Sequence, residues 1–164
     1  MDASNDKHEH LYDLISDFGT AMLVTNAGAN TMRARPMAVV ELRPDADAYF
    51  MTSIESPKVG EIEHDSNVLL TFQSSSQFAS VRGIARVDRD KALIKQHWKE
   101  SWKVWFPKGV DDPSLALIRF EAHEGEYWDN AGVQGMKYAF EAVKAYMQGE
   151  TPKTDDRQHG KVAL

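Results

Sequence analysis

The sequence predicts a mainly β protein, in which a mostly antiparallel sheet closes into a barrel flanked by helices. Short segments rich in β-branched and aromatic residues follow one another, and turn residues such as Asn, Gly, Pro and Asp separate them. Helical periodicity is confined to segments near the start, the middle and the end of the chain. Strands in consecutive hairpins favour an antiparallel barrel over a parallel α/β sheet.

The N-terminal half is expected to contain a helix, three strands and a second, shorter helix. The first helix has apolar residues at helical spacing over 11–18, and Gly19 ends it. The three strands are expected over residues 22–24, 33–42 and 49–52. The short helix follows over 56–65, where Ser56 and Pro57 suit a helix start.

The C-terminal half is expected to contain four strands, over residues 67–73, 78–87, 115–123 and 125–128. One helix is predicted over Asp88–Trp105, with His97 and Trp102 roughly on one side, and a loop follows it. A closing helix is predicted over Gln134–Gln148, and its apolar face includes Phe140.

Length, charge and cysteine usage limit the class of protein. The 164 residues suit one domain, residues 1–149, and the polar stretch 150–164 is expected to be a flexible tail. A net charge of −6 argues against a nucleic-acid partner, and the absence of cysteine excludes disulfides and a thiolate nucleophile. No apolar run approaches the roughly 18 residues of a membrane span, and the N-terminus is too polar for a signal peptide. We therefore expect a cytoplasmic protein without a membrane partner.

The stretch FMTSIESPKVGEI carries the first candidate site. A strand ends in Thr52 and Ser53, and Ser56, Pro57 and Lys58 precede the short helix. One interpretation is a capped helix start, which requires only Ser56 and Pro57. The other is a phosphate site, because a helix N-terminus offers free N–H groups and hydroxyls with an ammonium complete such a site. Both interpretations stay open on these residues alone.

Two further stretches, RARPM and GEYWDN, are candidates of the same kind. Arg33 and Arg35 have the same parity, so they point to one face of their strand, where Arg35 could meet the same anion as Lys58. The alternative is two exposed arginines beside Pro36, which marks a sheet edge or an irregularity. Trp128 belongs either to an aromatic pair in the core or to a surface that contacts a flat ring.

No metal site or catalytic residue is indicated. The six histidines show no HxxxH or HExxH pairing, and nothing places a Ser, a His and an Asp together. His97 on a Trp-rich helix suits packing better than catalysis.

Taken together, these stretches resemble a known family. The order RPM, YFMTSIESPKVGEIEHDSNVLLTF, SVRGIARV and EGEYWDN resembles the pyridoxamine 5′-phosphate oxidase-like group of FMN-binding split-barrel proteins. The segment HWKESWKVWFPKGVDDPSLALIRFEAHEGEYWD is most similar to the bacterial general stress proteins of that group. The resemblance covers about residues 8 to 148 and implies an antiparallel split β-barrel that binds FMN, with FAD as an alternative.

The resemblance also implies a set of cofactor-binding positions and a homodimer with flavin at its interface. The strand along the flavin ring, the residues around its phosphate, a glutamine and an aromatic residue fall on Arg33, Arg35, Pro36, Met37, Thr52, Ser53, Ser56, Lys58, Gln77 and Trp128. In the family this aromatic residue contacts the flavin of the other subunit. The alignment of Gln77 is less secure, because Phe78 competes for its position.

Two departures from the family affect the expected reaction. The oxidases carry a second basic residue beside the phosphate-binding lysine, and this chain has Pro57 there. They also carry a basic segment after the tryptophan, whereas this chain reads DNAGVQGMKY with Lys137 as its only basic residue. We therefore expect an FMN-binding general stress protein whose candidate activity is that of a flavin-dependent oxidoreductase other than a pyridoxamine phosphate oxidase. The alternatives are a flavin-storage dimer without turnover, a relative that uses a deazaflavin or haem, and a structural dimer with an empty cleft.

Overall fold

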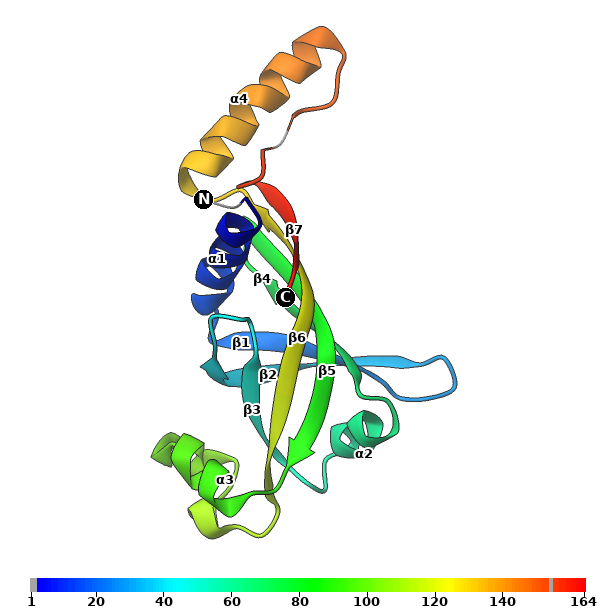
Figure 1. Ribbon diagram of the computed structural model, residues 1–164, viewed down its shortest axis with the longest axis vertical. Coiled ribbons are helices and arrows are strands. Elements are labelled where there is room, and N and C mark those ends of the chain that lie inside the picture. The colour runs from blue at the N-terminus through cyan, green and yellow to red at the C-terminus, as the bar shows by residue number, and fades with distance from the viewer. Residues whose placement is uncertain (1–2, 154) are drawn as a thin grey trace.

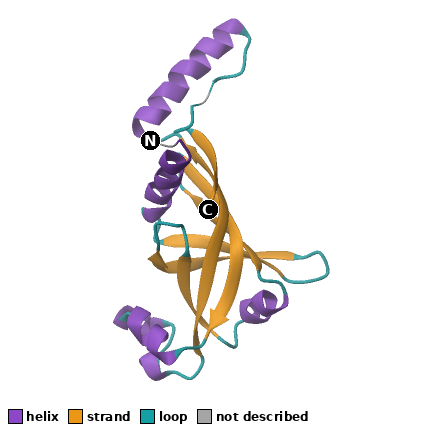
Figure 2. Ribbon diagram, viewed as in Figure 1, coloured by secondary structure: helices purple, strands orange, loops and turns teal. Residues whose placement is uncertain are grey.

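A seven-stranded antiparallel sheet runs through the computed structural model, which describes residues 3–153 and 155–164 (Figures 1 and 2). The strands are β1 (Thr20–Asn26), β2 (Met32–Leu42), β3 (Ala48–Ser53), β4 (Asn67–Gln73), β5 (Gln77–Asp88), β6 (Leu115–Asp129) and β7 (His159–Ala163). The helices are α1 (Ala3–Ser16), α2 (Pro57–His64), α3 (Lys91–His97) and α4 (Gly132–Gln148), with 3₁₀ turns η1 (Glu100–Val104) and η2 (Gly109–Asp111).

The first six strands close into a barrel, as the sequence predicts. Their order is β3-β2-β1-β4-β5-β6, and an additional pairing between β3 and β6 closes the ring. In β1 and β4 every second residue is buried, because successive side chains of a strand point to opposite faces. The core inside the barrel is formed by apolar side chains that are almost fully buried, among them Leu23, Phe50, Leu70, Val81 and Phe120.

The strand β6 is continuous, so the prediction of two strands over 115–123 and 125–128 is wrong. Arg82 pairs with Glu124 and Gly83 with Ala122, so His123 is the extra residue of a β-bulge. At this bulge a Cβ on residue 83 would lie 2.0 Å from the carbonyl oxygen of Glu121, a contact that only glycine avoids. The bulge accommodates the extra residue, His123, and the strand continues on both sides of it.

The C-terminal residues form a strand, so the expectation of a flexible tail is wrong for residues 159–163. This strand, β7, pairs with the C-terminal half of β6, and its Val162 is buried. The hydroxyl of Tyr127 donates to the backbone oxygen of Asp156, and burial, followed by the charge of Asp156, raises the pKa of Tyr127 to about 12. The C-terminal residues are poor in apolar side chains, which is why the sequence does not predict a strand there. They form one because the backbone N–H and C=O groups along the edge of β6 pair with them, and such pairing requires little apolar surface.

The predicted helix over 88–105 is also wrong, because it breaks after His97. Residues Trp98 and Lys99 are extended, and the turn η1 follows them. The ring of His97 stacks on Tyr49, and its Nε2 lies 2.5 Å from a carboxylate oxygen of Glu41. These contacts with β2 and β3 fix the end of α3 against the barrel.

The closing helix α4 is present as predicted, but it stands away from the barrel (Figure 1). Among its residues only Ala145 is buried, so its apolar face does not pack into the core of this chain.

Candidate functional site

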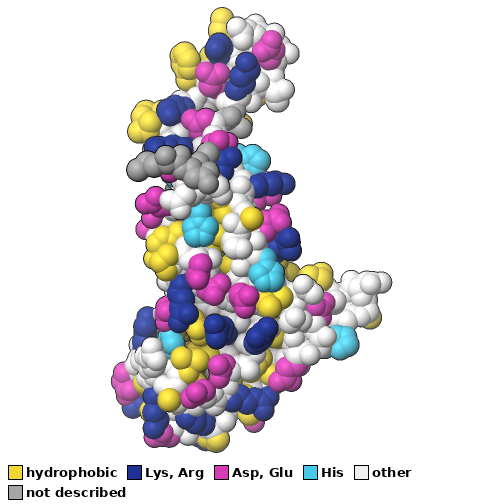
Figure 3. All heavy atoms as spheres, viewed as in Figure 1, with side chains coloured by type: hydrophobic (Ala, Val, Ile, Leu, Met, Phe, Trp, Pro, Cys, Tyr) yellow, Lys and Arg dark blue, Asp and Glu magenta, His cyan; other side chains and the backbone are white. Residues whose placement is uncertain are grey.

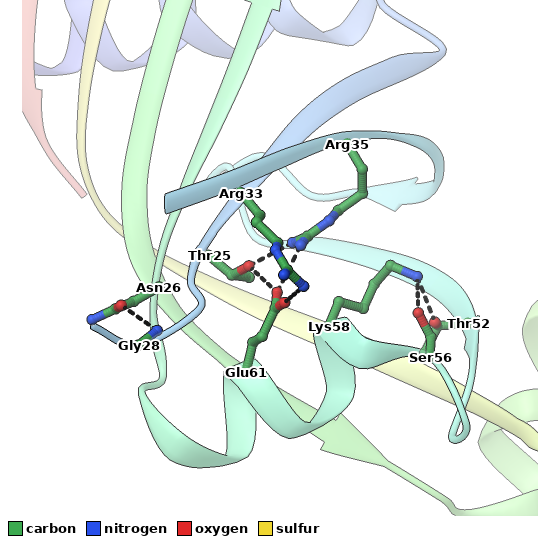
Figure 4. Close-up of polar contacts among 9 residues, drawn as sticks. All are labelled: Thr25, Asn26, Gly28, Arg33, Arg35, Thr52, Ser56, Lys58 and Glu61. Atoms are coloured by element: carbon green, nitrogen blue, oxygen red, sulfur yellow. Dashed lines mark hydrogen bonds and ion pairs between the residues drawn. The ribbon is translucent and has the colours of Figure 1, made fainter. Parts of the chain in front are cut away.

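Hydroxyl groups and one ammonium group converge where β3 passes into α2. The Nζ of Lys58 donates to the Oγ of Ser56 at 2.5 Å and to the Oγ1 of Thr52 at 3.3 Å (Figure 4). Ser56 occupies the N-cap position of α2 and Pro57 its first turn, yet the Ser56 side chain makes no capping hydrogen bond. Helix capping therefore accounts for the position of Ser56 in the chain and leaves its hydroxyl free to contact Lys58.

The ammonium of Lys58 has no acidic partner among the described residues. No ion pair of this lysine occurs within residues 3–153 and 155–164, and both of its hydrogen-bond partners are hydroxyls. Burial lowers the pKa of Lys58 below its usual 10.5, the charge of Arg35 lowers it further, and Glu61 partly offsets this. A partly buried cation beside hydroxyl groups is an arrangement that an anion would stabilise.

The two arginines of β2 meet a single carboxylate, that of Glu61 in α2. The Nη2 of Arg35 lies 2.6 Å from the Oε2 of Glu61, and the Nη1 of Arg33 lies 3.1 Å from its Oε1. Thr25 in β1 donates to Glu61 at 2.5 Å and accepts from Arg35 at 2.5 Å. The predicted shared face of Arg33 and Arg35 is thus confirmed, and Arg35 is bound to Glu61 next to Lys58 (Figure 4).

The carboxyl group of Glu61 stays ionised in this cluster. Burial alone would raise its pKa, but the hydrogen bond from Thr25, the ion pair with Arg35 and the charge of Arg33 outweigh it, so the pKa is lowered. The side chains of Arg35 and Glu61 are 19% and 9% exposed, which makes this a largely buried ion pair.

A groove of about 650 Å³ begins at the Lys58 ammonium and continues along β2. Its polar end is formed by Thr52, Ser53, Ser56 and Lys58, and the remaining lining residues are Thr20, Pro36, Met37, Ala38, Val40, Met51, Trp102, Trp105 and Phe106. The groove therefore has a cationic, hydroxyl-rich end and an apolar, aromatic remainder. Such a shape suits an elongated ligand with an anionic group at one end and a flat, apolar group at the other.

Six of the ten predicted cofactor-binding residues line this groove, and four do not. Gln77 lies at the start of β5, where its side chain donates to Asp129 at 3.3 Å. Trp128, near the end of β6, is 39% exposed and stacks on His159 with ring centroids 5.2 Å apart. In Figure 1 this end of the barrel lies opposite α2, so one chain does not bring Trp128 to Lys58. The other two are Arg33 and Arg35, which contact Glu61.

Sequence reasoning missed the aromatic side of the groove. Trp102 is almost buried, Trp105 is 67% exposed, and Phe106 lines the groove beside them. The sequence predicts one long helix for this segment, on which Trp102 would only pack. The signal available in the sequence is the cluster of tryptophans in HWKESWKVWFPKG, a density of aromatic residues greater than a small helix needs for packing.

Other classes of site find no support in the described part of the chain. Residues 3–153 and 155–164 contain no group of three or more His, Asp or Glu side chains arranged to hold a metal ion. Within the same residues, no helix is both long and apolar enough to cross a bilayer. The ring nitrogens of His97 contact Leu93 and Glu41, which gives this residue the packing role that the sequence indicated.

Comparison with known proteins places this geometry in a family. The model of the family described as pyridoxamine 5′-phosphate oxidase like matches residues 6–153. A protein related to general stress protein 26 of B. subtilis, from Clostridium acetobutylicum, has a TM-score of 0.69 at 18% identity, over 79% of this chain and 91% of that one. The general stress FMN/FAD binding protein from Xanthomonas citri has a TM-score of 0.66 at 27% identity, over 78% of this chain and 92% of that one.

A further relative matches over a shorter part of the chain. Protein bli-3 from Neurospora crassa is 29% identical over 91 residues, which cover 49% of this chain and 44% of bli-3. The match therefore spans less than half the length of that relative. The match of the family model covers most of the sequence, and the barrel agrees with the solved structures. The resemblance found in the sequence is confirmed, and the chain belongs to the pyridoxamine 5′-phosphate oxidase-like family.

Proposed function

We propose that this protein is a flavin-binding general stress protein that holds FMN in the groove along β2. The observation that carries the proposal is the ammonium of Lys58 at the polar end of an otherwise apolar groove. It donates to two hydroxyls and pairs with no carboxylate of the residues that the structure describes. The phosphate of FMN would bind Thr52, Ser53, Ser56 and Lys58. The Xanthomonas citri protein is described as FMN/FAD binding, which is consistent with this assignment.

The rest of the groove suits the flavin ring. Pro36 and Met37 present backbone and apolar surface from β2, and Trp102, Trp105 and Phe106 form an aromatic side. Aromatic rings bind flat ligands by stacking or edge contacts, and they also exclude water from the ring. A bound flavin would supply hydride or electron transfer, while these residues orient it and limit its access to solvent.

We further propose a cytoplasmic homodimer in which a second copy completes the site. Trp128 and Gln77 lie at the end of the barrel opposite Lys58, and Trp128 is partly exposed there. Contact between Trp128 and the flavin thus requires a partner subunit. A cofactor held by both subunits would stabilise the dimer, because it binds the assembled form more tightly.

A flavin-binding protein without turnover is the second candidate. Lys58 is the one titratable side chain among the described residues that line the groove, so these residues offer no separate general acid or base. In the segment DNAGVQGMKY, which follows Trp128, the sole basic residue is Lys137. It lies on α4, where its Nζ is 3.6 Å from a carboxylate oxygen of Asp155. Neither fact supports oxidation of pyridoxamine phosphate, so any activity would depend on the chemistry of the cofactor.

The test is the visible absorbance of freshly purified protein, followed by titration with FMN while flavin fluorescence is monitored. We expect Lys58→Ala to weaken FMN binding by about 10- to 100-fold, since charge-assisted hydrogen bonds contribute about 1.5–3 kcal/mol. Lys95→Ala, at an exposed lysine on α3, is the matched control and should bind FMN like the original protein. The proposal would be contradicted if the purified protein were colourless and did not bind added FMN. It would also be contradicted if Lys58→Ala and Lys95→Ala bound FMN with equal affinity. Oxidation of NAD(P)H no faster than with free flavin would favour the candidate without turnover.

A further inference from the structure

The end of α3 holds a buried histidine whose two ring nitrogens both face acceptors. The Nδ1 of His97 lies 2.9 Å from the backbone oxygen of Leu93, and its Nε2 lies 2.5 Å from the Oε2 of Glu41. A neutral imidazole donates through one nitrogen, so both contacts are hydrogen bonds if the ring carries two protons or if Glu41 carries one. The surface at the lower left of Figure 3, where α3 lies, carries basic and acidic side chains, whereas the side chain of His97 is 5% exposed.

The carboxyl group of Glu41 is the ionised member of this pair. Its Oε1 accepts from the Nε of Arg43 at 2.9 Å, and the hydrogen bonds from Arg43 and from His97 lower the pKa of Glu41 below its usual 4.5. A carboxylate has no proton to donate, so the proton between the two side chains belongs to the Nε2 of His97. His97 is therefore an imidazolium in this arrangement.

The position of the ring favours its charged form, and its burial opposes that form. His97 is the last residue of α3, where the helix dipole stabilises a cation. Its ring also stacks on Tyr49 with centroids 4.9 Å apart, and the face of an aromatic ring attracts positive charge. Burial disfavours any charged group, so the ring stays charged only while its partners are in place.

The charged and titratable groups around His97 come from the two strands beneath it. β2 contributes Glu41 and Arg43, and β3 contributes Tyr49, over whose ring Arg43 lies at 4.9 Å. β6 packs against α3 with apolar side chains, and on α3 itself Lys95 pairs with Asp111 of η2. Histidine is the side chain of this set that ordinarily changes charge between about pH 5 and 8.

His97 lies where the chain turns toward the aromatic side of the groove. Trp98 and Lys99 directly after it are extended, and η1 then begins. Trp102 lies within η1 and Trp105 directly after it, and both line the groove. The anchor at the end of α3 thus precedes the residues that form this side of the groove.

Glu41 is connected to the same groove from the other side. The register between β2 and β3 shifts just before Glu41, which leaves Val40 as the extra residue of a β-bulge. Val40 packs with Met51 and Phe106 against the apolar cluster beneath α3, and all three also line the groove. The contact between His97 and Glu41 therefore joins the two elements that enclose this part of the groove.

We propose that His97 is a positioning residue for the aromatic side of the groove and acts through its charged form. The imidazolium ties the end of α3 to β2, and this contact restrains residues 98–106. The restraint is complete where His97 is charged and Glu41 is ionised. It weakens as the pH rises and the ring loses a proton, and it weakens in acid as Glu41 gains one. Its consequence for flavin rests on the function proposed above, whereas the restraint itself does not.

Hydrogen exchange of the flavin-free protein tests the restraint without any contribution from the cofactor. Exchange rates of residues 98–106, divided by the chemical rate at each pH, should rise about tenfold between pH 6 and pH 8.5, because a charge-assisted hydrogen bond is lost. His97→Gln cannot carry the charge and should exchange rapidly at both pH values. The matched control is His123→Gln, at an exposed histidine 3.8 Å from Glu121, which should behave like the original protein. Equal protection of the original protein at both pH values, or an unchanged pH dependence in His97→Gln, would overturn the proposal.

Nitrogen-15 NMR of the original protein provides a second test that requires no substitution. Both ring nitrogens of His97 should be protonated at pH 6, and one should lose its proton in the pH range where residues 98–106 lose protection. A ring that is neutral at pH 6, or that titrates while these residues stay protected, would refute the role of its charge. Loss of protection with pH in a protein that does not bind FMN would support this inference and contradict the proposed function, so the two can fail separately.

Discussion

Replacing Glu61 by glutamine would test how the charges beside the groove are arranged. The substitution keeps the shape of the side chain but removes the charge that holds Arg33 and Arg35. The pair with Arg33, which is 58% exposed, contributes little, on the order of 0–1 kcal/mol. The pair with Arg35 is largely buried. The amide oxygen of glutamine can still accept a hydrogen bond from this guanidinium, but it does not balance its charge.

We expect Glu61→Gln to lower the free energy of unfolding by about 2–4 kcal/mol, since breaking a buried ion pair costs about 3–5 kcal/mol and Arg35 retains some contact with water. For a domain of this size, this corresponds to a fall in Tm of about 4–16 °C. The matched control is Glu63→Gln on the same helix, whose pair with Arg89 is exposed at both ends. It should change the free energy of unfolding by less than about 1 kcal/mol.

Urea denaturation at several pH values provides the assay. The pKa of Glu61 is lowered in the folded protein, so its contribution to stability is present above its usual pKa of 4.5 and is lost as the pH falls through the folded value. The difference in stability between the original protein and Glu61→Gln should therefore shrink in acid. Equal effects of Glu61→Gln and Glu63→Gln at pH 7, or a difference that persists at low pH, would refute the reasoning.

Three other predictions concern the groove and the C-terminal strand. Because phosphate binding requires the charged form of Lys58, whose pKa is lowered, FMN affinity should fall as the pH rises through that value, and fluorescence titration of Lys58→Arg should show the fall displaced to higher pH. Trp105→Ala should weaken FMN binding roughly 3- to 10-fold, the loss of one aromatic contact, while thermal unfolding without FMN stays unchanged because Trp105 is exposed. Deletion of residues 159–164 should cost about 2–4 kcal/mol in urea denaturation, because it removes buried Val162 and uncovers the edge of β6; an unchanged midpoint would show that β7 is dispensable.

The barrel could be predicted from the sequence because the residue pattern within each segment indicates a strand. Burial alternates along β1, β4 and β5, and turn residues separate the first five strands. The hairpin order implies the pairings β1–β2, β2–β3 and β4–β5. The errors lie where distant contacts decide the local structure. The end of α3 depends on the contacts of His97 with Glu41 and Tyr49, more than 40 residues away, and β7 exists because β6 has an edge free to pair. The periodicity of apolar residues along the chain predicts neither the end of α3 nor the presence of β7.

The candidate site shows the same limit. Thr52, Ser53, Ser56 and Lys58 lie close together in the sequence, and the structure gathers them as neighbours on the groove. The position of Arg35 could not be predicted in this way, because its partner Glu61 is on α2, and only the fold brings the two together. The aromatic side of the groove was hidden for the related reason that the break after His97, which redirects Trp102 and Trp105, is itself a tertiary effect.

The charges around the groove explain how a phosphate could bind without the second basic residue that Pro57 replaces. Lys58, Arg33 and Arg35 carry three positive charges and Glu61 carries one negative charge, so the cluster has a net charge of +2. A phosphate monoester carries a charge close to −2 near pH 7. Glu61 therefore holds the arginines in place while leaving enough positive charge for the ligand, with Lys58 as the contact and the arginines acting through their field. If this is correct, Glu61→Gln should reduce stability without weakening FMN binding, because it raises the net charge beside the phosphate. Weaker FMN binding by this variant in the folded state would show instead that the position of Arg35, more than the sum of the charges, determines affinity.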